Sequence, residues 1–102
     1  MMDVDRVRSE VLEILTHKLH KLPPLADGLA NGFDYEGQRL VPDITDNHLD
    51  IAEVAMDLED AFGINFEETL PGGPGMETIG QVIAFIIAKL GLSAPSGSGA
   101  AP

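Results

Sequence analysis

One histidine and a row of acidic residues between positions 43 and 60 hold most of the chemistry that the sequence offers. His48 carries an imidazole that titrates near neutral pH, and Asp50, Glu53, Asp57 and Asp60 follow it three or four residues apart. No serine or cysteine accompanies the histidine in this stretch. A histidine without a nucleophile or a fixed acidic partner is a poor indication of catalysis. We therefore expect no enzyme and interpret His48 as a solvated surface residue, with a role as base or ligand as the alternative.

The four acids recur at helical spacing and would form one stripe along a helix. A solvated helix face is the simplest interpretation. Like charges at this spacing destabilise an isolated helix, and a basic partner surface would offset that cost. Leu49 and Met56 lie beside the acids and would add apolar contact. The stripe is thus also a candidate docking surface for another protein.

The residue types and their spacing give little support for a metal or phosphate site. His17 and His20 are three residues apart and could share a metal, but no thiolate accompanies them. Residues 43–54 fail as a calcium loop because Val54 stands where a glutamate is needed. The Gly/Pro-rich residues 71–75 lack the Gly-Lys-Ser/Thr continuation of a phosphate-binding loop. We expect no bound metal.

The net charge of the chain indicates which class of macromolecule it can bind. The chain of 102 residues has 17 acidic and 6 basic side chains, for a net charge of −11. Such a surface repels phosphate backbones, which disfavours nucleic-acid binding. It is attracted to basic patches on other proteins, with fast and salt-sensitive association.

Sequence signals for membrane insertion and secretion are missing. The longest apolar run, residues 82–88, is much shorter than the roughly 18–20 residues that span a bilayer. The first residues are acidic and polar, unlike a signal peptide. The chain has no cysteine, so disulfides are excluded. We expect a cytoplasmic monomer without a membrane span.

Apolar periodicity and turn residues define the elements. Residues 4–21, 47–62 and 77–90 have the three- and four-residue repeat of amphipathic helices. Asp3 can cap the first helix, and Asp46 or Asn47 the second. Residues 23–47 form a long connection that leaves room for a short extra helix near residues 25–31. Residues 64–70 have room for about one further helical turn.

These elements predict an all-α fold: a four-helix bundle with three long helices, one short helix and a long first loop. With one tyrosine, four phenylalanines and no tryptophan, its core must be mainly aliphatic. We assign residues 1–92 to one helical domain. Residues 93–102 contain only Ser, Ala, Gly and Pro, and we expect them to be disordered.

The stretch that contains His48 resembles the acyl carrier protein family. The family signature, Asp-Leu-Gly-x-Asp-Ser-Leu-Asp, opens a helix that continues with Glu, Met, Leu, Glu, Glu and Phe. A gapless alignment matches eight positions: Asp43, Leu49, Asp50, Glu53, Met56, Leu58, Glu59 and Phe62. Residues 78–86 resemble the start of the family's fourth helix. The resemblance covers roughly residues 4–91, with a longer first loop and a Gly/Pro-rich insert.

The resemblance implies a prosthetic-group position and an acyl pocket. In the family a serine at the start of the second helix carries 4′-phosphopantetheine; here that position holds His48, so attachment is doubtful, and Thr45 is the nearest hydroxyl. The same helix is the surface that carrier-handling enzymes recognise, which here comprises Leu49, Asp50, Glu53, Met56, Asp57 and Asp60. Residues that would line a sleeve for an acyl chain are Leu58, Phe66, Ile79 and Ile83.

The leading hypothesis is a carrier-protein homologue of fatty-acid, lipid or polyketide biosynthesis. It would present its acidic helix, and a tethered acyl group if one is attached, to basic surfaces of acyl-chain-handling enzymes. The first alternative is a non-carrier interaction module that has lost the attachment serine. The second is a lipid binder that uses the interior of the bundle.

Overall fold

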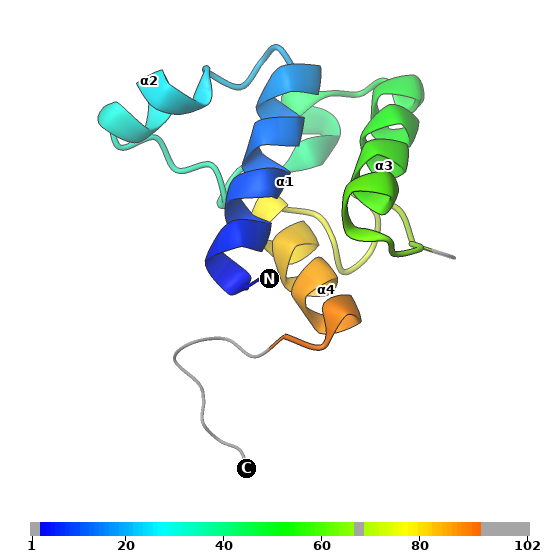
Figure 1. The fold of residues 1–102 in the computed structure, drawn as a ribbon. Coiled ribbons are helices and arrows are strands. Elements are labelled where there is room, and N and C mark those ends of the chain that lie inside the picture. The colour runs from blue at the N-terminus through cyan, green and yellow to red at the C-terminus, as the bar shows by residue number, and fades with distance from the viewer. Residues whose placement is uncertain (1–2, 67–68, 93–102) are drawn as a thin grey trace.

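Helices make up the regular structure of this chain (Figure 1). The computed structural model describes residues 3–66 and 69–92. Its elements are α1 (Val4–Lys18), α2 (Leu25–Ala30), the wide turn η1 (Leu40–Ile44), α3 (His48–Phe62) and α4 (Ile79–Leu90). Within these residues there is no strand, and one isolated β-bridge joins Arg39 and Thr78. The prediction of an all-α fold is confirmed.

Side-chain caps fix where the three long helices begin. The Asp3 carboxylate accepts a hydrogen bond from Arg6 N at 2.8 Å, at the start of α1. Thr78 caps α4, and its hydroxyl and the side chain of Gln81 complete a reciprocal capping box. Gly63 and Gly91, with φ of 66° and 72°, end α3 and α4 in the left-handed conformation that glycine adopts without strain. These local signals explain why the three long helices were predictable.

The one short helix of the predicted bundle is found in the connection after α1. α2 occupies the stretch near residues 25–31 where an extra helix was expected. Residues 64–66 and 69–70, in contrast, are not helical, and residues 67 and 68 lie outside the described part. α1 also ends at Lys18, before the expected end near Lys21, and α4 begins at Ile79. The predicted disordered tail, residues 93–102, lies outside the described residues.

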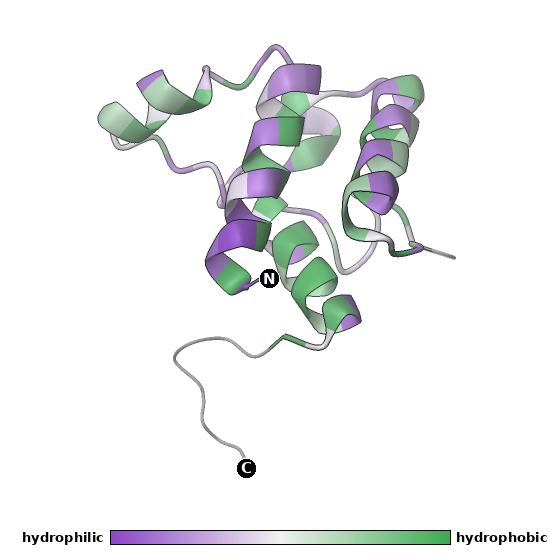
Figure 2. Cartoon of the chain, in the orientation of Figure 1, coloured by the Kyte–Doolittle hydropathy of each residue, from purple (hydrophilic) through white to green (hydrophobic). Residues whose placement is uncertain are grey.

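α1 is the helix on which the others pack, since it contacts α2, α3 and α4. Its buried stripe includes Val7, Val11 and Leu15. The facing stripes are Ile51, Val54, Ala55, Leu58 and Phe62 of α3 and Ile79, Val82, Ile83 and Ile86 of α4. Figure 2 shows polar and apolar residues alternating along α1 and α3, whereas α4 is mainly hydrophobic. The core is mainly aliphatic, as predicted, and each large side chain in it contributes about 1.5–3 kcal/mol by leaving water.

The connection from α2 to α3 returns to the core and closes it. Tyr35, Leu40 and Ile44 are buried in the same cluster as the helices. Its backbone meets the start of α4: Leu40 N donates to Glu77 O at 2.9 Å, and Ile79 N donates to Gln38 O at 3.0 Å. In the described part of the chain no helix is long and apolar enough to cross a bilayer.

The chain's one tyrosine holds α2 in place. The Tyr35 hydroxyl donates to the carbonyl oxygens of Pro23 and Pro24, at 2.9 and 3.1 Å. Gly28 of α2 lies directly against this ring, because a Cβ at that position would be 1.8 Å from the hydroxyl oxygen. Burial, and then the Asp27 carboxylate, raises the pKa of the Tyr35 phenol above its ordinary value.

We predict that Tyr35 titrates at higher pH in the folded chain than in urea. The unfolded phenol has a pKa of about 10, so unfolded chains lose this proton first as the pH rises. The contribution of Tyr35 to stability is therefore complete below about pH 10 and declines as the pH approaches the folded-state pKa. Phenolate absorbance measures this directly, because Tyr35 is the sole tyrosine. Equal midpoints with and without urea would contradict the prediction.

Candidate functional site

The start of α3 is where the sequence placed the prosthetic-group position. His48 is the first residue of the helix, and it is exposed. The preceding residue, Asn47, is the N-cap; its side-chain oxygen accepts a hydrogen bond from Leu49 N at 2.8 Å. This satisfies one of the free amides of the first turn. His48 therefore faces solvent at a well-formed helix start, as the sequence predicted for a surface histidine.

Thr45 supplies the nearest hydroxyl, and that hydroxyl has two partners. Its Oγ1 donates to Asp50 Oδ2 at 2.8 Å and accepts from Asn47 N at 3.1 Å. The residue is half-buried. This pairing could not be predicted from the sequence, because two adjacent residues, Asp46 and Asn47, could each cap the helix and its exact start was open. Thr45 and Asp50 together clamp the chain where it enters α3.

All six predicted recognition residues lie on one face of α3. At about 100° per residue, they fall within an arc of roughly 120°. The buried stripe of α3 lies on the opposite side of the helix. The set consists of Leu49, Asp50, Glu53, Met56, Asp57 and Asp60; below it is called the α3 face. The structure therefore brings these residues together as the sequence predicted.

Along one edge of the α3 face, apolar and acidic side chains alternate. Leu49 and Met56 are 72% and 62% exposed, although both are large and hydrophobic. Glu53 and Asp60 lie in the same narrow arc and are also exposed. This edge can offer a partner both apolar contact and negative charge.

The two acids on the other edge of the α3 face have side-chain partners within the same chain. Asp57 forms an ion pair with Lys18 Nζ at 3.4 Å, and Asp50 accepts from Thr45. Both acids are half-buried. An open groove of about 650 Å³ lies next to this edge, lined by His17, Lys18, Leu19, His20, Lys21, Ile44, Asp50 and Glu53. Asp50 and Asp57 thus have structural partners, which leaves Glu53 and Asp60 as the acids that best report binding.

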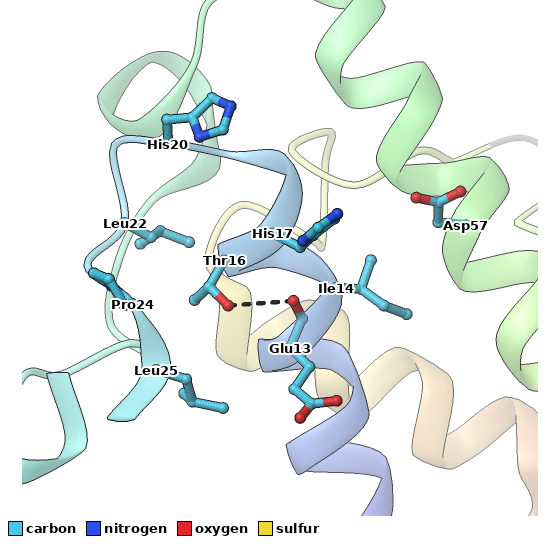
Figure 3. A pocket seen from close by; sticks show the side chains of 9 residues that line it. All are labelled: Glu13, Ile14, Thr16, His17, His20, Leu22, Pro24, Leu25 and Asp57. Carbon is cyan, nitrogen blue, oxygen red and sulfur yellow. Dashed lines mark hydrogen bonds between the residues drawn. The ribbon is translucent and has the colours of Figure 1, made fainter. Parts of the chain in front are cut away.

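A second groove of about 650 Å³ surrounds the end of α1 (Figure 3). His17 lies on the last turn of α1 and His20 on the turn that follows it, and their rings do not point toward one another (Figure 3). Among the described residues, no group of three or more His, Cys, Asp and Glu side chains is placed to hold a metal ion. The geometry of this groove therefore gives no support to a shared metal between the two histidines.

The four candidates for an acyl sleeve lie together in the hydrophobic core. Leu58, Phe66, Ile79 and Ile83 are all at most 2% exposed and belong to one cluster. The Phe66 ring stacks on Phe85 with 5.5 Å between the ring centroids. Glu59 Oε2 accepts from Phe66 N at 2.9 Å and so holds the start of the loop after α3. An acyl chain would have to separate these side chains, and its binding there remains a prediction.

Comparison with protein-family models, with curated proteins and with solved structures gave no match to this chain. The candidate site is thus a largely exposed face of α3 with an exposed histidine at its start.

We predict that Asn47→Ala lowers the free energy of unfolding by about 1 kcal/mol, because the cap on Leu49 N is lost. Urea denaturation followed by circular dichroism measures the change. Asn65→Ala is the control, since Asn65 is exposed in the loop after α3 and surface changes usually stay within about 0.5 kcal/mol. An equal effect of the two substitutions would show that Asn47 does not cap α3.

Proposed function

We propose that this chain is a non-catalytic docking protein of the carrier-protein type. Its α3 face binds basic surfaces of enzymes that handle acyl chains in fatty-acid, lipid or polyketide biosynthesis. An arrangement of helices like that of acyl carrier proteins is part of this proposal, and it rests on the residue pattern around His48.

One observation carries the proposal: two large apolar side chains are exposed beside acids on a single helix. Leu49 and Met56 lie outside the core, and Glu53 and Asp60 accompany them in the same arc. Isolated exposed hydrophobic residues are common and need no explanation. Here the two share one line with two acids, and a binding surface typically has an apolar centre and a polar rim.

The charge of the chain supports the proposal. With a net charge of −11, the protein attracts a basic surface over roughly 10 Å at 0.1 M salt. Attraction of this kind raises association rates and weakens with salt. The apolar tips of Leu49 and Met56 would then determine how long the complex lasts, because their burial removes apolar area from water.

The proposed docking function is also supported by which of the carrier-like residues lie on the surface and which lie in the core. Of the eight positions that resemble the carrier family, four are exposed: Asp43, Leu49, Glu53 and Met56. Leu58 and Phe62 are buried on the opposite side of the same helix. The residues that a carrier would need for docking thus point outward, and those that it would need for folding point inward.

We predict that Met56→Ala weakens binding to a broad-range phosphopantetheinyl transferase, the probe for a carrier-docking surface, by about tenfold. The estimate follows because about 1.4 kcal/mol of lost apolar contact corresponds to tenfold in affinity. The double change Glu53→Gln, Asp60→Asn slows association at low salt, and the difference shrinks at high salt. Biolayer interferometry with the immobilised chain measures both effects.

Glu13→Gln with Glu77→Gln is the matched control. It also removes two negative charges, but from exposed positions on α1 and ahead of α4. Equal slowing by both double variants would mean that the net charge acts without a defined face. Unchanged binding by Met56→Ala and by the α3 double variant would rule out the α3 face as the docking surface.

A further inference from the structure

We infer that this chain carries no phosphopantetheine and acts as an arm-free mimic that occupies the carrier-docking site of an enzyme without delivering an acyl group. The inference rests on the proposed docking function and adds a mode of action: competition with loaded carriers. It follows from a disagreement between the residues at the start of α3 and the group that the carrier resemblance implies.

Attachment needs an accessible hydroxyl next to the α3 face. The hydroxyl oxygen would lose its proton and form a bond to the phosphorus of coenzyme A's pantetheine phosphate. The pyrophosphate P–O bond of coenzyme A would break, and adenosine 3′,5′-bisphosphate would leave. His48, the exposed first residue of α3, has no hydroxyl. A ring nitrogen could form only a labile phosphoramidate. The residue at the expected position therefore does not fit the group.

Thr45 does not fit the group either. Its hydroxyl proton is used in the bond to Asp50 Oδ2, and an oxygen lone pair is used by Asn47 N. A phosphodiester on this oxygen would replace the proton shared with Asp50 by a negative charge beside a carboxylate. Like charges at such distances repel strongly. Attachment would also break the clamp at the entry to α3.

The other hydroxyl groups in the described part of the chain lie on other elements or serve the fold. Ser9 is within α1, and Thr16 donates to Glu13 O at 3.2 Å in the same helix. Thr78 accepts from Gln81 N and caps α4, and the Tyr35 hydroxyl is engaged beneath α2. Thr69 lies in the loop between α3 and α4. None of these residues starts α3.

The imidazole of His48 does not disturb the docking features. His48 is exposed, so its imidazole displaces no core residue. The cap on Leu49 N comes from Asn47 and does not involve the histidine side chain. Leu49, Glu53 and Met56 keep their exposure on the α3 face. The protein therefore retains what an enzyme would bind and lacks what an enzyme would load, which is the property of a competitor.

One reaction tests this inference. The full chain is mixed with a standard serine-bearing carrier, coenzyme A and a broad-range phosphopantetheinyl transferase, and the intact masses of both proteins are followed. We expect the standard carrier to gain one phosphopantetheine and this chain to gain nothing. Increasing amounts of this chain should slow modification of the carrier several-fold, and Met56→Ala should relieve that inhibition.

His48→Ser is the matched variant, with circular dichroism as the check on folding. It should gain one phosphopantetheine, since the docking face is present and only the hydroxyl is missing. A mass gain by the unaltered chain would overturn the arm-free inference and leave docking standing; loss of that gain in Thr45→Val would identify Thr45 as the acceptor. Modification of His48→Ser without any inhibition by the unaltered chain would overturn competition alone. If there is neither inhibition nor modification of His48→Ser, the proposed docking function is overturned as well.

Discussion

A short antiparallel contact between the long connection and the start of α4 determines where the candidate site lies. Leu40 N donates to Glu77 O, Ile79 N to Gln38 O and Gly80 N to Glu36 O, at 2.9, 3.0 and 2.9 Å. Two of the donors are free amides of the first turn of α4, which otherwise have no partner within the helix. These bonds hold the long connection against α4, and from there the chain runs through η1 directly to Asn47. The start of α3, and with it His48, is therefore positioned by this contact and not by helix packing alone.

The buried side of the same connection adds the second constraint. Leu40 and Ile44 enter the aliphatic core, and Tyr35 anchors α2 through the carbonyl oxygens of Pro23 and Pro24. With the connection fixed, α3 buries one stripe against α1 and presents the opposite face to solvent. The exposure of Leu49 and Met56 follows from this geometry, because both lie diametrically away from Leu58 on the helix. The proposed docking surface is thus a consequence of how the connection is closed.

Much of this organisation could be predicted from local sequence signals. The three long helices follow from apolar periodicity, from the caps Asp3, Asn47 and Thr78, and from the terminating residues Gly63 and Gly91. The α3 face could be predicted for the same reason, since residues three and four apart share a side of a helix. The pairing of Gln38 with Ile79 and the bond between Thr45 and Asp50 could not. The first joins residues far apart in sequence, and the second depends on which of the two candidate caps, Asp46 or Asn47, begins the helix.

The proposed binding of a basic partner surface by one face of α3 can be tested residue by residue. Titration of ¹⁵N-labelled chain with the phosphopantetheinyl transferase, followed by amide chemical shifts, tests it most directly, because each residue reports separately. We expect the largest changes on Leu49, Glu53, Met56 and Asp60, while amides of α2 and of the outer side of α1 stay unchanged. Changes concentrated on α2 or on the groove around His17 and His20, with the α3 amides unaffected, would contradict the proposed binding.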